Sequence, residues 1–247
     1  TTACNFTTTP SPSLLVTLPS FTVYHIMWPR VLPLLALGLA VQASAVAAAP
    51  LNATLFEFTD TSKPWVVTND PVMGGVSYSN FTVVDGLGVF AGEVKIVPFL
   101  HAPGTCQSEA AKFAPVDCNA FDAIEIRLES NGALKQFQAS WSGPFVPKPA
   151  GSPHYRKNAY KATFNVTGTG ALETLVVPMA AFTSSYSTYT GGCTDHDAVC
   201  CSPQNPEVCP SPKTKSAVTD FGIDAQGTLG KFELRIKSIR AISSSGQ

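Results

Sequence analysis

The hydrophobic pattern after position 50 consists of short apolar runs separated by Gly, Pro, Asn and Ser, and no segment keeps a helical period. Runs of this kind, rich in β-branched and aromatic residues, are typical of β-strands. The pattern therefore predicts an all-β protein with strands over residues 55–58, 77–84, 89–97, 123–128, 136–141, 160–166, 174–177, 220–223 and 232–242.

Two of these runs predict how the strands face a core. In residues 123–128 aliphatic and charged side chains alternate, so one face would lie against the core and the other against water. In residues 232–242 the same alternation is interrupted after Ile236. A β-bulge near Ser238 would restore it.

A strongly apolar leader precedes the strand pattern. Met27 is followed by the apolar run 31–41 and then by small residues in Ala-x-Ala spacing up to Ala49. The run fits the roughly 7–15 residues of a secretory signal peptide and is shorter than the roughly 20 needed to cross a bilayer. We therefore expect residues 27–49 to be a signal peptide and expect no transmembrane anchor.

The leader also sets the expected domain boundaries. Residues 1–26 contain no methionine and are rich in Thr, Ser and Pro, so we interpret them as an upstream extension of the gene model. Residues 50–247 contain no repeat or linker and are long enough to bury one full core. We predict a single β-sandwich domain there, secreted or held in the lumen of the secretory pathway.

The charge balance of the chain and its N-glycosylation triplets both fit this interpretation. The chain carries 16 basic and 17 acidic residues, so we expect no strong field and no nucleic-acid partner. N-glycosylation acceptors have to lie on the surface of a secreted protein. Such triplets begin at Asn52, Asn80 and Asn165.

The domain contains six cysteines, an even number that predicts up to three disulfides in an oxidising compartment. They are Cys106, Cys118, Cys193, Cys200, Cys201 and Cys209. The adjacent pair Cys200 and Cys201 suits two bridges that leave in opposite directions. Cys106–Cys118 is the preferred local pair, and the remaining connectivity stays open.

Metal binding and catalysis are weaker interpretations of the same residues. His196 with nearby thiolates would suit zinc, and Asp195 with Asp197 would suit calcium. Oxidation of the cysteines and the lack of an acidic ladder argue against both. No Gly-x-Ser-x-Gly or His-Glu-x-x-His motif is present. We therefore expect no metal, no cofactor and no enzymatic activity.

The string Asn69-Asp-Pro-Val-Met-Gly-Gly-Val-Ser77 is the most specific motif of the chain. Its Asp-Pro step restricts the backbone and its Gly-Gly pair permits positive φ, so the chain must turn tightly before the next strand. Asn69 and Asp70 would offer hydrogen bonds to a sugar or peptide, with Trp65 as a stacking face. In the alternative interpretation, Asp70 caps the turn and Trp65 belongs to the core.

This motif resembles the beginning of the complex I intermediate-associated protein 30 family. The similarity spans nearly all of residues 55–242. It includes Trp65 upstream, Phe90-Ala-Gly-Glu93, the strand 123–128, Val177-Pro-Met-Ala-Ala-Phe182, Phe221-Gly-Ile223 and the run 232–239.

The resemblance implies a galactose-binding-like β-sandwich of the jelly-roll type, whose members mostly bind carbohydrate or protein through loops at one end. Known family members are assembly factors for mitochondrial respiratory complex I or plastid proteins that assist gene expression, and fold alone transfers neither role. This chain also departs from the family. An arginine that commonly follows a Gly-Gly-Phe segment has no match in residues 98–107, and the leader is not an Arg-rich transit peptide.

The leading hypothesis is a non-catalytic, secreted or lumenal β-sandwich that binds a glycan or a protein. Contacts are expected from the loop at residues 65–77 and from the basic, proline-rich segment 144–158. The candidate contact residues are Trp65, Asn69, Asp70, Met73, Gly74, Gly75, Ser77, Tyr155 and Lys157. One alternative is an assembly factor or chaperone for complex I or another organellar membrane complex, located in the mitochondrion. Another is a weak hydrolase that uses Asp70.

Overall fold

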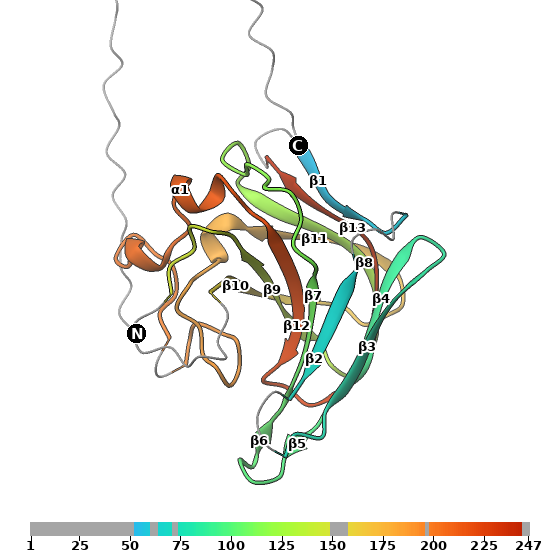
Figure 1. Ribbon diagram of the computed structural model, residues 1–247. Helices are drawn as coiled ribbons and strands as arrows, with labels where there is room; N and C mark the ends of the chain where they lie inside the picture. Colours follow the sequence, from blue (N-terminus) through green and yellow to red (C-terminus); the bar gives the residue numbers. More distant parts are fainter. Residues whose placement is uncertain (1–51, 60–63, 71–73, 149–157, 196–197, 244–247) are drawn as a thin grey trace, which may run out of the picture. The chain divides into compact units, whose positions relative to one another are not determined.

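Two antiparallel sheets pack face to face in the computed structural model, which describes residues 52–59, 64–70, 74–148, 158–195 and 198–243 (Figure 1). The first sheet has the order β11-β8-β13-β4-β3, with β1 also paired to β13. Its strands are β1 (Asn52–Glu57), β3 (Tyr78–Val84), β4 (Leu87–Val94), β8 (Ala123–Gly132), β11 (Leu172–Pro178) and β13 (Gly230–Ile242). The predicted all-β sandwich is confirmed.

The second sheet has five strands in the order β10-β9-β12-β7-β2. Its strands are β2 (Trp65–Asn69), β7 (Thr105–Ala110), β9 (Gln136–Ser142), β10 (Tyr160–Asn165) and β12 (Asp220–Gln226). A small hairpin projects beside it, formed by β5 (Ile96–Val97) and β6 (Ala102–Pro103). The helical segments are only the short η1 (Met179–Ala181), η2 (Pro206–Val208) and α1 (Pro212–Lys215) within the described residues. None of the described helices is long and apolar enough to cross a membrane.

The core lies between the two sheets and is rich in aromatic rings. Phe232 of the first sheet contacts Phe90 beside it and Phe137 of the second sheet, with ring centroids 4.9 and 5.6 Å apart. In β8, the side chains of Ile126 and Leu128 are completely buried, as the alternation predicts. Rings of this size bury large apolar areas and fix the spacing of the two layers.

The predicted bulge in the last strand is confirmed. The register between β13 and β8 shifts between Ile236 and Ser238, so one additional residue of β13 is accommodated there. Ile236 before the shift and Ile239 after it are both fully buried. The bulge therefore returns the apolar side chains to the core.

Two full strands of the second sheet were not predicted. In β7 the inward side chains are Cys106, Ser108 and Ala110, which are small and only weakly apolar, so the strand has no apolar alternation. Strand β2 lies at the sheet edge and is short. Strand β7 matters for the site because Gln107 and Glu109 lie on its floor.

The cysteines confirm one expectation and correct another. Cys193–Cys200 and Cys201–Cys209 form disulfides that leave the adjacent pair in opposite directions, as expected. The expected pair Cys106–Cys118 is wrong, since both residues are free and buried. Cys106 points into the sandwich, where its Sγ lies 3.5 Å from the carbonyl oxygen of Tyr78. Strand pairing of β7 therefore decides the environment of this thiol.

Several expectations concern the surface or lie outside the described residues. Asn52, Asn80 and Asn165 are all exposed, as glycosylation requires. The expected extension 1–26 and signal peptide 27–49 lie outside the described residues. The described residues form one compact unit that contains both sheets.

The two free thiols should be unreactive in the folded protein. Burial raises the pKa of Cys106 to about 12 and that of Cys118 to about 11, so neither forms thiolate near neutral pH. Iodoacetamide at pH 8 should modify both only after denaturation, as measured by peptide mass mapping. A mapped peptide in which Cys106 is linked to Cys118 would contradict the structure.

Candidate functional site

Trp65 lies between the sheets and is not a stacking face on a loop. Its indole stacks on Phe81 of the opposite sheet, with centroids 4.5 Å and planes 5° apart, and meets the edge of Phe56 at 5.2 Å. Its contacts match the alternative in which this residue belongs to the core.

Asp70 ties the two sheets together at the end of β2. Its Oδ2 accepts the backbone N–H of Ser77 at 2.6 Å, and its Oδ1 accepts that of Thr105 at 2.5 Å. Ser77 leads into β3 of the first sheet, and Thr105 begins β7 of the second. The Asp70 backbone is left-handed, with a φ of 37°. The carboxylate therefore organises the turn, which is the capping role.

The glycines around Asp70 are needed because the carboxylate approaches the backbone closely. A Cβ at Gly75 would lie 1.8 Å from Asp70 Cβ, and one at Gly104 would lie 2.0 Å from Asp70 Oδ1. Gly74, in contrast, has open space around it and a φ of 84°. The two glycines thus serve the turn in different ways. Gly74 allows a positive φ, and Gly75 leaves room for the Asp70 side chain.

The remaining residues predicted for the ligand loop are also engaged in structure. Asn69 Oδ1 accepts the hydroxyl of Ser79 at 2.5 Å, and Ser77 Oγ accepts the N–H of Lys95 at 3.0 Å. Met73, Tyr155 and Lys157 lie outside the described residues. Of the predicted contact residues that the structure describes, Asp70 is the one that also lines a cavity.

A polar face lies instead on the outside of the five-stranded sheet. Asp224 of β12 is paired with Gln107 of β7 and with Gln138 of β9. Beside this row, Ser140 of β9 is paired with Lys161 of β10. Side chains at such paired positions point to the same side of a sheet. This side faces away from the core, yet it carries amide, hydroxyl and charged groups that are largely buried.

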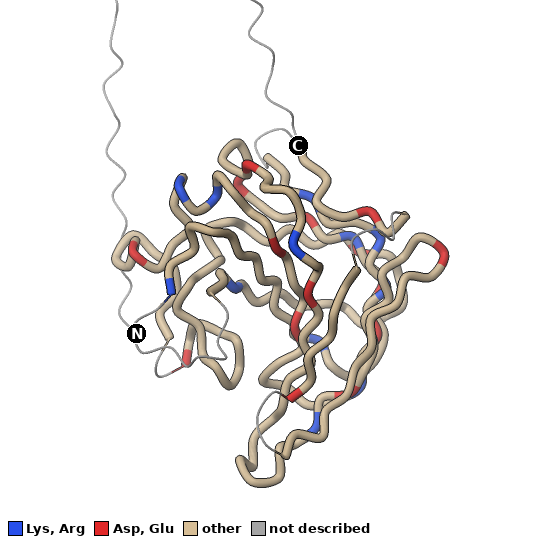
Figure 2. The backbone as a smooth tube through the Cα atoms, viewed as in Figure 1, with Lys and Arg blue, Asp and Glu red and all other residues tan. Residues whose placement is uncertain are grey.

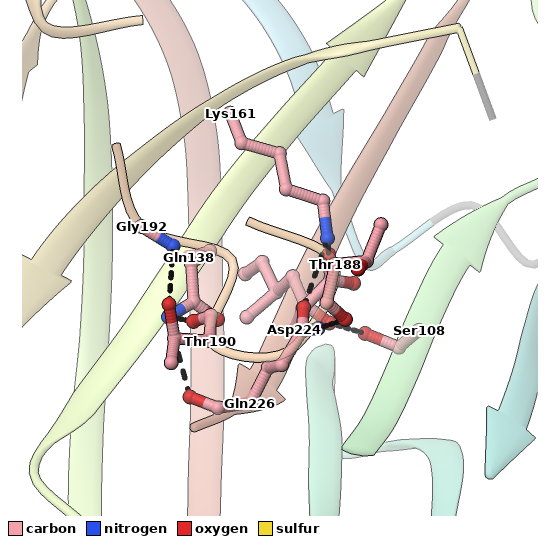
Figure 3. Close-up of polar contacts among 9 residues, drawn as sticks. Ser108, Gln138, Lys161, Thr188, Thr190, Gly192, Asp224 and Gln226 are labelled. Atoms are coloured by element: carbon pink, nitrogen blue, oxygen red, sulfur yellow. Dashed lines mark hydrogen bonds and ion pairs between the residues drawn. The ribbon is translucent and has the colours of Figure 1, made fainter. Parts of the chain in front are cut away.

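An ion pair occupies the middle of this face (Figure 3). Lys161 Nζ lies 2.6 Å from Asp224 Oδ2 and donates to Gln226 Oε1 at 3.3 Å. The Lys161 and Asp224 side chains are only 6% and 3% exposed. Lys161 Nζ also lies 5.0 Å from the centre of the Tyr186 ring. Since an unpaired buried charge is costly, these contacts hold both side chains in fixed positions.

The segment that follows β11, from Thr183 onward, covers the polar face and buries the ion pair; it is here named the covering segment. It begins with paired backbone hydrogen bonds between Thr183 and Lys161 on the edge strand. Further along, Gln138 Nε2 donates to the carbonyl of Thr190 at 3.1 Å, and Gln226 Nε2 donates to that of Thr188 at 2.6 Å (Figure 3). Two buried glutamines thus fasten residues 188–192, here named the crossing loop, to the sheet.

The two disulfides lie in the chain that follows and supports the crossing loop. Thr183 Oγ1 donates to the carbonyl of Val199 at 2.7 Å, and Ser184 N donates to that of Val208 at 2.9 Å. The disulfide Cys193–Cys200 links the chain just after the crossing loop to the residue that follows Val199. The cysteine-rich segment therefore supports the residues Tyr186, Thr188 and Tyr189, which form one wall of the site.

A cavity of about 200 Å³ opens between this wall and the β5–β6 hairpin. Gln107, Glu109 and Asp224 are on its floor, Tyr186 and Tyr189 are on the covering segment, and Val97, Leu100 and Pro103 are on the hairpin side. Such a cavity combines several polar groups with aromatic and aliphatic walls, which is the usual composition of a small-ligand site.

The cavity is more acidic than the protein as a whole. Its lining contains the carboxylates of Asp70, Glu109 and Asp224 but only the ammonium of Lys161, which is paired with Asp224. Over the described domain, basic and acidic residues are interspersed (Figure 2). The excess of carboxylates opposes an anionic ligand.

Sequence reasoning missed this site, although a signal was present. The strand 220–226 carries Asp220, Asp224 and Gln226 at positions of the same parity, between apolar residues, and Lys161 interrupts another apolar run. Charged and amide side chains at period two mark one face of a strand as polar. What the sequence does not show is that the segment after β11 folds over this face and turns it into a cavity.

Metal binding finds no support in the described residues. No group of three or more His, Cys, Asp or Glu side chains is close enough there to hold a metal ion. The four cysteines of the covering segment are joined in disulfides, so their thiolates are not available as ligands. His196 and Asp197 lie outside the described residues.

The variant Asp70→Asn should destabilise the domain without preventing the positive φ, because asparagine also tolerates that conformation. It removes the charge and one acceptor from the two backbone hydrogen bonds, at an expected cost of about 1.5–3 kcal/mol in the free energy of unfolding. Denaturant titration measures this. The matched control is Asp85→Asn in the exposed turn after β3, which should change stability by less than about 0.5 kcal/mol. Equal effects of the two variants would contradict the role given to Asp70.

The variant Lys161→Met should cost about 3–5 kcal/mol, because it leaves the buried Asp224 carboxylate without its cation. The double variant Lys161→Met with Asp224→Leu should recover most of this loss, since neither charge is then buried. Thermal and denaturant unfolding compare the two with Lys231→Met, which removes an exposed lysine. A double variant no more stable than Lys161→Met would show that the pair is not the source of the cost.

The arrangement of the two sheets is shared with carbohydrate-binding modules of known structure. One is the family 11 module from Clostridium thermocellum in complex with a β-1,3-1,4-mixed-linked tetrasaccharide, with 11% sequence identity, 79% of this chain and 98% of that chain covered, and a TM-score of 0.50. Another is the family 11 module of the cellulosomal cellulase Lic26A-Cel5E of the same organism, at 12% identity, 80% and 97% coverage, and a TM-score of 0.48. At such identities the likeness concerns the fold, which is the expected galactose-binding-like jelly roll. No curated protein matches the chain.

The sequence itself matches one family profile. The complex I intermediate-associated protein 30 profile matches residues 54–195, more than half of the chain. This range begins in β1 and ends between β11 and β12. The predicted resemblance is therefore confirmed, and the chain is a member of the complex I intermediate-associated protein 30 family.

Proposed function

We propose that this domain is a non-catalytic module that binds a neutral carbohydrate in the cavity on the outer face of its five-stranded sheet. The observation that carries the proposal is the lining, in which amide and carboxylate groups on the floor face tyrosines and aliphatic side chains on the walls. Sugar hydroxyls both donate and accept hydrogen bonds, and the C–H faces of a sugar ring pack against aromatic rings.

Preorganisation of the cavity supports this proposal. Gln138, Asp224 and Gln226 are at most 5% exposed, and their hydrogen bonds fix the floor and the crossing loop before a ligand arrives. A site that is already ordered loses less conformational entropy on binding. The acidic lining favours neutral over uronic or sulfated sugars.

The likeness of the fold to a carbohydrate-binding module agrees with this proposal. That module is described in complex with a mixed-linked tetrasaccharide, and it shares the two-sheet arrangement with this chain. The argument for the ligand nevertheless depends on the residues of this chain, because the sequences are 11% identical.

We also propose that the protein acts outside the cytoplasm. Two disulfides support this location, because such bonds persist mainly in secreted and lumenal proteins. The family name supports a second candidate, in which the domain binds a protein during assembly of a respiratory complex in mitochondria. Localisation of the tagged full chain distinguishes the two: glycosylated protein in the secretory pathway supports the first, and mitochondrial import supports the second.

The binding test is a glycan array with the folded domain, followed by titration calorimetry with the best neutral oligosaccharide. Gln107→Ala removes an amide from the cavity floor and should weaken binding about tenfold, which corresponds to one hydrogen bond of about 1.4 kcal/mol. Gln204→Ala, an exposed amide in the loop before η2, is the matched control and should bind like the original. Binding only of acidic glycans, or no difference between the two variants, would refute the proposed site.

A further inference from the structure

A second cavity lies on the same side of the five-stranded sheet. Its volume is about 550 Å³, and its lining combines hydroxyl and amide groups with alanines, glycines and disulfide-bonded cysteines. The charged residues of this lining are Lys161 and Asp195. Gln136 and Thr163 contribute from β9 and β10, and Thr190 and Thr194 contribute from the covering segment. Thr163 is exposed, so this part of the sheet face is open to solvent.

The two cavities are neighbours that share part of their lining. Lys161 and Gln226 border both of them. The crossing loop separates them, because Thr188 lines the first cavity and Gly192 lines the second. Hydrogen bonds from Gln138 and Gln226 hold the crossing loop on the sheet (Figure 3).

The crossing loop, which separates the two cavities, carries an aromatic ring. Tyr189 is 59% exposed, although it belongs to the lining of the first cavity. Its backbone N–H donates to Ser187 Oγ at 3.1 Å, which fixes the turn that carries the ring. An exposed tyrosine on an ordered turn is a suitable platform for the C–H face of a sugar ring.

We infer that the ligand is a chain of several sugar units that occupies both cavities and crosses the loop over Tyr189. This inference rests on the proposed function and adds the shape of the ligand to it. A single sugar would fill only one cavity. A linear, neutral oligosaccharide offers hydroxyl groups to both floors and a ring to the tyrosine between them.

The test measures affinity against chain length by titration calorimetry. The probes are glucose, cellobiose and β-1,3-1,4-linked gluco-oligosaccharides of four and six units, chosen because they are neutral and linear. Affinity should increase with length up to at least four units. Equal affinity for two and six units would overturn the inference while leaving the proposed function standing. The absence of binding by every member would overturn both.

Three variants locate the chain on the protein. Tyr189→Ala should weaken binding of the six-unit probe about tenfold, whereas Tyr189→Phe should retain it, because the ring and not the hydroxyl makes the contact. Thr163→Ala should weaken binding of the six-unit probe and leave the two-unit probe unchanged. Tyr78→Ala removes a tyrosine of similar exposure from the other sheet and is the matched control. A loss for Thr163→Ala that is equal for both probes, or none for Tyr189→Ala, would refute the two-cavity arrangement.

Discussion

The buried ion pair between Lys161 and Asp224 is the interaction on which the site depends. Two charges on the outer face of a sheet would ordinarily be solvated, but here they are covered by the segment after β11. Their burial is tolerable only because they neutralise each other and because Gln226 and Tyr186 complete the surroundings of the ammonium. The pair therefore links the floor of the cavity to the position of its wall.

The same constraint explains why the covering segment is so strongly fastened. Gln138 and Gln226 hold the crossing loop by its carbonyl oxygens, and two disulfides hold the chain that supports it. A loosely attached segment would let water reach the pair and would leave the cavity without one wall. Asp70 has a corresponding role on the opposite side, where it joins the starts of β3 and β7.

The fold could be predicted from the sequence because its core strands show the period of two directly. The run around Ile126 and the interrupted run around Ser238 both have the structure that their patterns indicate. Strand β7 escaped prediction because its inward residues are small, and the expected Cys106–Cys118 bond failed because β7 directs Cys106 into the sandwich. The short distance between two cysteines in the sequence does not reveal the direction in which their side chains point.

The site was much harder to predict than the fold. The motif at Asn69–Ser77 is specific because a tight turn needs it, and the Asp70 carboxylate accepts the backbone N–H groups of Ser77 and Thr105 there. The residues of the polar face come from β7, β9, β10 and β12, and long-range strand pairing alone brings them together. Their polarity was visible in the sequence, but their convergence was not.

Amide chemical-shift mapping of the labelled domain during titration with a neutral oligosaccharide tests the central claim most directly. The shifts should concentrate on Gln107 and Glu109 of β7, on Asp224 of β12 and on the crossing loop. Shifts confined to the outer face of the six-stranded sheet would contradict the account.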